Sequence, residues 1–205
     1  MSDCGCSIEI KDKEQKQVLY WLLAINALMF LVELSLGWFA ESTGLIADSL
    51  DNLADTIVYS IGLYAVGRAA ADKAKAALVS GYFQAILGTL IVIDIVRRTV
   101  MGSEPESALM IGVGFAALMA NTVCLLLIQK HKDGEVHMRA SWIFSTNDII
   151  ANLGIIISGG LVWWLDNRWP DIVIGTIVML VILRGARLII REAKNELNKR
   201  AQAKL

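Results

Sequence analysis

Three aspartates lie within eight residues of one long apolar stretch, Gly44-Leu-Ile-Ala-Asp48-Ser-Leu-Asp51-Asn-Leu-Ala-Asp55. On an α-helix, Asp48, Asp51 and Asp55 fall within an arc of about 60°. Asp51 and Asp55 are one turn apart, so their carboxylates can meet around one ion. Ionised and unpartnered in a bilayer, the three would cost on the order of 8–10 kcal/mol. The pattern predicts a cation-binding face that points into a helix bundle; the alternative is three separate caps or interfacial residues.

A second polar face lies about 90 residues further along the chain, where Ser145, Asp148 and Asn152 share one side of a predicted helix. Ser141 and Phe144 belong to the same face, whereas Asn147 lies to one side of it and is a poorer ligand candidate. An intramembrane aspartate on a different helix is what a cation site between helices requires. The alternative is a polar residue hydrogen-bonded within a helix interface.

Other polar residues interrupt the apolar runs. Asn26 and Glu33 are seven residues apart and share a face, which suits either support of the cation site or a purely structural partnership. Asp94 precedes Arg97 and Arg98 by three and four residues, a spacing that predicts a salt bridge near the membrane surface.

The elements that must position these residues are six predicted membrane-spanning helices. The chain has 205 residues, of which 56% are hydrophobic and 19% charged, with a mean hydropathy of +0.55. This composition excludes a disordered chain, a disulfide-rich module and a basic nucleic-acid binder. Backbone groups in lipid must be satisfied within each segment, so the fold class is all-α. The predicted spans are 18–40, 44–69, 76–96, 108–128, 140–165 and 172–190.

The basic residues predict the orientation of these spans. Of the 19 Lys and Arg residues, all but Arg97, Arg98 and Arg168 fall on one set of flanks, which should therefore face the cytoplasm. Both termini are then cytoplasmic, in a multi-pass protein of the plasma or inner membrane. We expect a cytoplasmic tail over 1–17, a six-helix transmembrane domain over 18–190 and a short cytoplasmic tail over 191–205. Four tryptophans should lie in the outer interfacial belt: Trp38, Trp163, Trp164 and Trp169.

Two further sets of residues could collect metal ions on the cytoplasmic side. Cys4 and Cys6 form a C-x-C pair in a compartment where a structural disulfide is not expected, which leaves soft-metal collection or no metal role at all. His131 and His137 lie in a polar loop, where histidines are usually just solvated and weak metal collection is the minority interpretation.

The stretch from Asn26 to Asp55, with Glu33, Gly37 and the motif containing Asp48, Asp51 and Asp55, resembles the cation diffusion facilitator family. The stretch Arg139-Ala-Ser-Trp-Ile-Phe144-Ser-Thr-Asn-Asp148-Ile-Ile-Ala-Asn152 is similar to it too. The resemblance implies a homodimeric exporter that exchanges a divalent cation for protons by alternating access. It also implies that Asp51 and Asp55 match one pair of transport ligands and Asp148 the last member of another. Asp48 matches an acidic position that usually is not a direct ligand.

The sequence departs from the family pattern in two places. Phe144 occupies the first position of the second ligand pair and cannot coordinate a cation, which leaves Asn152, Ser145, Asp48 or water to complete the site. Losing an imidazole there moves the ligand set toward hard oxygens and toward Mn²⁺, Fe²⁺ or Co²⁺ relative to tetrahedral Zn²⁺. After the sixth span only about 15 residues remain, so we expect the family's cytoplasmic metal-sensing domain to be absent.

The leading hypothesis is therefore proton-coupled efflux of a divalent cation of the Zn²⁺, Co²⁺, Cd²⁺, Fe²⁺ and Mn²⁺ class, by a homodimer in the bilayer with no enzymatic activity, no resident cofactor and no nucleic-acid partner. One alternative is an intramembrane prenyl or phosphatidyl transferase that holds Mg²⁺ on Asp-rich helices. Another is a passive cation channel, whose flux would not depend on a proton gradient.

Overall fold

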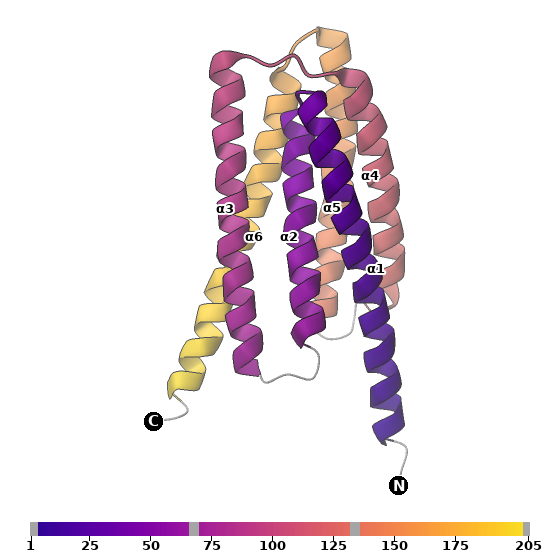
Figure 1. Ribbon diagram of the computed structural model, residues 1–205, viewed down its shortest axis with the longest axis vertical. Coiled ribbons are helices and arrows are strands. Elements are labelled where there is room, and N and C mark those ends of the chain that lie inside the picture. Colours follow the sequence, from indigo (N-terminus) through magenta and orange to yellow (C-terminus); the bar gives the residue numbers. More distant parts are fainter. Residues whose placement is uncertain (1–3, 66–69, 132–135, 203–205) are drawn as a thin grey trace.

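The computed structural model describes residues 4–65, 70–131 and 136–202, with side chains over 13–64, 74–75, 77–130, 142 and 145–198. Six long helices form one bundle (Figure 1). They are α1 (Cys4–Phe39), α2 (Thr43–Ala65), α3 (Ala70–Met101), α4 (Ser107–Ile128), α5 (Val136–Leu165) and α6 (Trp169–Gln202), with a short 3-10 turn, η1 (Gln129–His131), after α4. The described ranges contain no strand, and the all-α prediction is confirmed.

Five of the six helices are long and apolar enough to cross a membrane. The exception is α2, which carries three aspartates within its length. This helix lies at the centre of the bundle in Figure 1, where the other helices rather than lipid surround it. A helix in this position can carry carboxylates whose contact with lipid would be costly.

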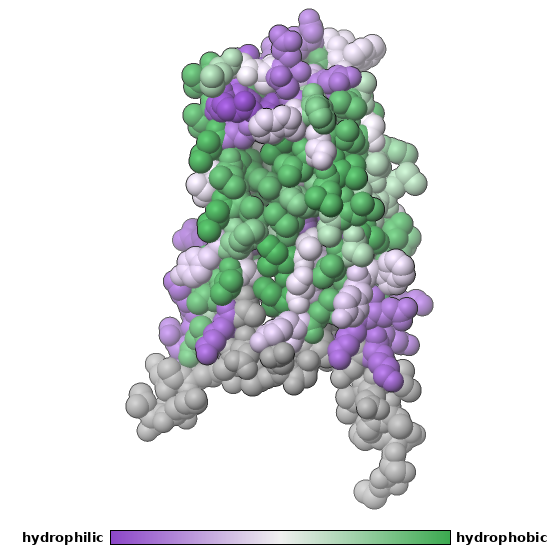
Figure 2. All heavy atoms as spheres, in the orientation of Figure 1, coloured by the Kyte–Doolittle hydropathy of each residue, from purple (hydrophilic) through white to green (hydrophobic). Residues whose placement is uncertain are grey.

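The outer surface of the bundle is apolar in its middle part. Figure 2 shows a green band of hydrophobic residues between two ends where hydrophilic residues gather. Large side chains such as Leu31, Phe115 and Ile157 are exposed on it. A soluble protein rarely exposes so continuous an apolar surface. The chain is an integral membrane protein, and an apolar band of this kind suits contact with lipid.

Both ends of the chain lie at the same end of the bundle (Figure 1). The even number of helices produces this arrangement. Trp38, Trp163 and Trp164, which the sequence assigns to an interfacial belt, are exposed near the opposite end of their helices. Assignment of the two ends to cytoplasm and exterior stays a prediction from the basic residues.

The helices pack chiefly as three pairs, α1 with α2, α4 with α5, and α3 with α6. Glycines allow the third pair to approach closely. A Cβ atom built at Gly88 would lie 2.4 Å from Leu183 Cδ2, and one at Gly81 would lie 2.7 Å from Ile190 Cγ1. The absence of a side chain at these two positions therefore sets the distance between α3 and α6.

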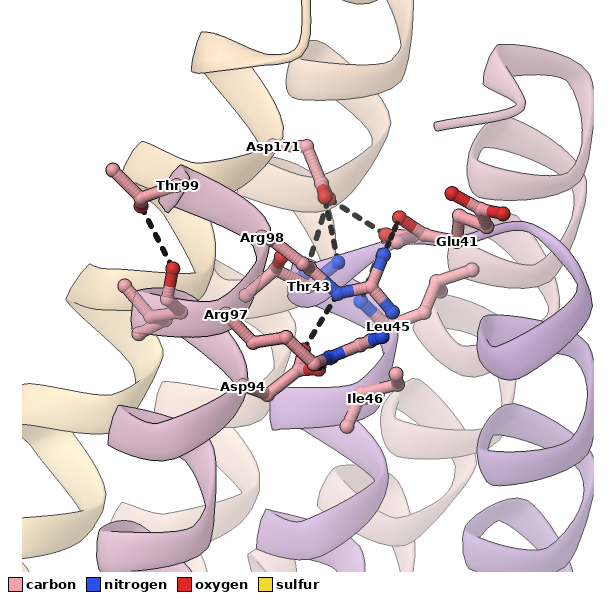
Figure 3. Close-up of polar contacts among 12 residues, drawn as sticks. Glu41, Thr43, Leu45, Ile46, Asp94, Arg97, Arg98, Thr99 and Asp171 are labelled. Carbon is pink, nitrogen blue, oxygen red and sulfur yellow. Dashed lines mark hydrogen bonds and ion pairs between the residues drawn. The ribbon is translucent and has the colours of Figure 1, made fainter. Parts of the chain in front are cut away.

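At the end away from the termini, Asp171 of α6 caps the N-terminus of α2 (Figure 3). Its carboxylate accepts hydrogen bonds from the Thr43 N–H at 2.6 Å, the Gly44 N–H at 3.0 Å and the Ser42 hydroxyl at 2.6 Å. These N–H groups have no acceptor within their own helix, and a carboxylate also suits the positive end of the helix dipole. The contact fixes the helix that carries the acidic motif to α6.

The same end holds the predicted salt bridge. Asp94 pairs with Arg97 at 2.8 Å and with Arg98 at 2.7 Å, which confirms the expectation from their spacing. Arg98 also donates to the backbone carbonyl of Glu41 (Figure 3). Glu41 has a φ of +47° in the tight turn between α1 and α2. The guanidinium therefore ties α3 to that turn.

Candidate metal-transport site

A cavity of about 480 Å³ lies among α2, α3, α5 and α6. Its apolar wall comes mainly from α6, between Ile174 and Leu188. That stretch is about 21 Å long at 1.5 Å per residue, so the cavity follows much of the membrane-spanning part of α6. The polar residues that line it are Asp51, Asp55, Gln84, Asn147, Asp148 and Arg184.

The three carboxylates predicted as transport ligands share this cavity. Asp51 and Asp55 reach it from successive turns of α2, and Asp148 reaches it from α5. Asp55 and Asp148 are only 4% and 6% exposed, whereas Asp51 is half-buried. Asp148 is near enough to both α2 carboxylates for their charges to interact. A cation in the cavity would relieve the repulsion among these carboxylates.

These carboxylates keep acceptor capacity for an ion. Asp55 Oδ2 accepts a 3.0 Å hydrogen bond from the Tyr59 hydroxyl, which orients the carboxylate. Asp148 Oδ2 is buried without a hydrogen-bond partner. A buried carboxylate oxygen without a partner is costly, and a bound cation is one way to satisfy it.

The carboxylates line one cavity without forming a finished coordination sphere. In the parts of the chain whose side chains are described, no three His, Cys, Asp or Glu side chains are close enough to hold an ion as they stand. Helix geometry predicts that Asp51 and Asp55 share one face of α2. It does not predict their distance from Asp148, because that distance depends on how α2 and α5 pack.

Asp48 and Asn152, predicted as possible support, belong to a neighbouring buried polar cluster and are not among the cavity-lining residues. Asn152 of α5 donates a 2.6 Å hydrogen bond to Asp48 Oδ2 and accepts one at 3.0 Å from Asn121 of α4. The cluster thus joins three helices directly beside the cavity.

Glu33 of α1 extends this cluster. Asn52 of α2 donates to Glu33 Oε2 at 2.9 Å, and the Glu33 carboxyl group lies near that of Asp48. Asn26 bonds instead to the Leu22 carbonyl and to Cys124 Sγ. Glu33 therefore supports the aspartate helix, whereas Asn26 and Cys124 connect α1 to α4.

Three residues at the cavity were not selected from the sequence as site residues. Asn147 lies off the polar arc of α5 and still reaches the cavity, because α6 lies on that side of the helix. Gln84 on α3 and Arg184 on α6 also line it. The sequence could have indicated Gln84, because a polar carboxamide in the middle of an apolar run is expected to face the bundle interior. The side chains of Phe144, Cys4, Cys6, His131 and His137 lie outside the described residues.

A helix bundle with an apolar outer band and a carboxylate-lined internal cavity defines a class, the polytopic membrane proteins that handle cations. Comparison with known protein families assigns the chain to one family within this class. Residues 19–197 match the family described as the cation efflux transmembrane domain, and the chain belongs to this family, the cation diffusion facilitators.

Several relatives are named as zinc transporters. The chain is 24% identical over 200 residues to zinc transporter ZitB of Escherichia coli, which covers 91% of this chain and 64% of the relative. It is 26% identical over 202 residues to ZitB of Yersinia pestis, with the same coverage. It is 32% identical over 130 residues to the vacuolar zinc transporter ZRC1 of Saccharomyces cerevisiae, covering 57% of this chain and 29% of the relative. The chain thus spans about 64% of the length of the ZitB proteins.

Proposed function

We propose that this chain exports divalent metal cations in exchange for protons, with Asp51, Asp55 and Asp148 as the transport ligands. The observation that carries the proposal is the meeting of these three carboxylates in one cavity inside a membrane bundle. Membership of the cation efflux family and the zinc transport named for its relatives support a divalent metal as substrate.

The two ends of the bundle support alternating access. The end away from the termini is tied by Asp171 to α2 and by Arg98 to the α1–α2 turn. The cavity begins below these ties and follows α6 toward the end where the termini lie. If that end is cytoplasmic, as the basic residues predict, a cation would enter the cavity from the cytoplasm. Opening the opposite end would then require the contacts of Asp171 and Arg98 to break.

Proton coupling follows from the chemistry of clustered carboxylates. Three acids around one cavity repel one another when ionised, so protons can replace a departing cation. The resulting exchange keeps the buried charge nearly constant through the cycle. We further propose that the protein works as a homodimer in the plasma or inner membrane, with both termini cytoplasmic, and that it has no enzymatic activity.

The proposal is tested by metal flux into proteoliposomes that contain a metal-sensitive dye, with and without an imposed pH gradient. We expect the wild type to move at least one of Zn²⁺, Mn²⁺, Fe²⁺ and Co²⁺ faster with the gradient, and Asp51→Asn or Asp55→Asn to abolish that flux. Glu106→Gln is the matched control, because Glu106 is an exposed carboxylate at the start of α4 whose side chain makes no cap hydrogen bond. Flux that ignores the pH gradient would identify a channel, and no flux of any divalent ion would refute transport.

A further inference from the structure

One of the three carboxylates at the cavity is held by a side chain from outside the cavity wall. The Tyr59 hydroxyl donates a 3.0 Å hydrogen bond to Asp55 Oδ2. The two residues are one turn apart on α2, so the hydroxyl reaches back to the carboxylate of the preceding turn. Asp55 lines the cavity, whereas Tyr59 is not among the lining residues. One oxygen of Asp55 is therefore occupied by a donor that does not belong to the cavity.

The ring of Tyr59 is enclosed by other side chains. Tyr59 is 0% exposed and packs in a cluster with Leu19 and Leu22 of α1 and with Cys124 and Ile128 of α4. A ring packed so closely has little room to turn its hydroxyl away from the carboxylate. Helices α1 and α4 thus fix the donor of this hydrogen bond, although no described residue of either helix lines the cavity.

Tyr59 is also placed near the second helix of the proposed site. Its side chain lies near the carboxylate of Asp148 on α5 as well as bonding to Asp55 on α2. A buried tyrosine hydroxyl usually needs an acceptor, so this hydrogen bond also has a purely structural interpretation. The two interpretations differ in their consequence for ion selectivity, because only a positioned carboxylate changes how a cation is coordinated.

A carboxylate can bind a cation through one oxygen or through both. Because Oδ2 of Asp55 already accepts from Tyr59, Oδ1 is the oxygen left for an ion in the cavity. Ca²⁺ takes about six to eight oxygen ligands and often uses both oxygens of a carboxylate. Zn²⁺ is satisfied by about four ligands. Withholding one oxygen of Asp55 therefore disfavours Ca²⁺ more than a transition-metal ion with fewer ligands.

We propose that Tyr59 is a positioning residue that restricts Asp55 to one oxygen in cation binding and thereby favours transition-metal ions over Ca²⁺. The inference rests on the proposed function and adds a determinant of its selectivity. It also gives α1 and α4 a part in ion selection, because their side chains hold the ring whose hydroxyl orients the carboxylate.

The experiment is calorimetric titration of the purified full-length chain with Zn²⁺, Mn²⁺, Co²⁺ and Ca²⁺. Tyr59→Phe keeps the ring and removes the hydroxyl. It should weaken binding of the transition-metal ion that the wild type binds most tightly by roughly tenfold, the scale on which loss of a group that orients a ligand acts at metal sites. Binding of Ca²⁺ should stay unchanged or strengthen, because Asp55 Oδ2 becomes free. A purely structural role would weaken all four ions by the same factor.

Ser49→Ala is the matched control. Ser49 is a buried residue of α2 whose hydroxyl donates to the Ile46 carbonyl, and it does not line the cavity. Thermal unfolding verifies that both variants fold. Unchanged affinities in Tyr59→Phe, an equal loss for all four ions, or the same change in Ser49→Ala would overturn the role of Tyr59 and leave the carboxylate site intact.

The wild type provides a second test that does not depend on the folding of any variant. We expect it to bind at least one of the three transition-metal ions more tightly than Ca²⁺. Equal or tighter binding of Ca²⁺ would overturn the inference without refuting cation binding. If the wild type binds no divalent cation at all, the proposed function itself fails and the inference fails with it.

Discussion

The carboxylate of Asp171, on the first turn of α6, accepts a 2.6 Å hydrogen bond from the backbone N–H of Thr43, the first residue of α2. The helix that carries the acidic motif is thus capped by a residue 128 positions away in the sequence. A contact of this kind joins the position of Asp51 and Asp55 to the position of α6, the helix that forms most of the cavity wall.

Replacement of Asp171 by Ala should destabilise the bundle. The change leaves the N–H groups of Thr43 and Gly44 without their acceptor, and loss of an N-terminal cap costs about 1–2 kcal/mol. Thermal unfolding in detergent measures the effect. Glu192→Ala is the control, because Glu192 is an exposed carboxylate on α6 that takes no part in this cap. Equal stability of the two variants would show that the cap contributes nothing.

Gly88→Ala should impair packing between α3 and α6. Its methyl group would fall 2.4 Å from Leu183 Cδ2, so either the helices must separate or Leu183 must change rotamer. Overpacking of this kind typically costs about 1–3 kcal/mol. The double variant Gly88→Ala with Leu183→Ala should recover part of the loss, because it removes the clashing atoms.

Gly112→Ala serves as the control for that prediction, since a Cβ atom at Gly112 would have no neighbour within 4 Å. The unfolding temperatures of Gly88→Ala, of the double variant and of Gly112→Ala test the predicted loss of stability. A Gly88→Ala protein as stable as the Gly112→Ala protein would contradict close packing at this position.

Asn152→Ala should destabilise the protein more than it weakens cation binding. It removes the donor to Asp48 and the acceptor for Asn121, and leaving buried polar groups unpaired costs about 1–3 kcal/mol each. Because Asn152 does not line the cavity, cation affinity should fall less than in Asp148→Ala. Parallel unfolding and calorimetric titration test this, with the exposed Leu153→Ala as control. A larger loss of affinity than in Asp148→Ala would make Asn152 a direct ligand.

Phe144→His should tighten Zn²⁺ binding. Residue 144 lies on α5 one turn before Asp148, the spacing at which two side chains can reach one ion. An imidazole there would restore the nitrogen donor that Zn²⁺ favours. A calorimetric panel of Zn²⁺, Mn²⁺ and Co²⁺ on wild type and variant measures the shift. Identical affinities across the panel would show that residue 144 does not face the site.

Much of this architecture could be predicted from sequence, because the dominant forces act locally. Long apolar runs must become helices in lipid, and a one-turn spacing must place Asp51 and Asp55 on one face. The pairing of Asp94 with Arg97 and Arg98 follows from the same periodicity.

The remaining features depend on packing between helices. The hydrogen bonds that Asp171 accepts from α2 depend on the rotation and contact of whole helices. The same holds for the separation of Asp48 and Asn152 from the cavity and for the place of Gln84 in its lining. Periodicity within one helix does not determine which neighbour a polar face meets. For this reason the pattern of polar residues predicts that carboxylates of α2 and α5 face the bundle interior, but it does not predict that a residue of α3 lines the same cavity.

The central claim is that carboxylates from α2 and α5 hold one cation together, and a double-mutant cycle of metal affinity tests it most directly. Calorimetric titration would compare the wild type with Asp51→Asn, Asp148→Asn and the double variant. If both residues bind the same ion, each single change should weaken binding by about tenfold or more, and the double change should cost clearly less than the sum of the two free energies. Losses that add independently, or affinities that none of the changes alters, would contradict a shared site in the cavity.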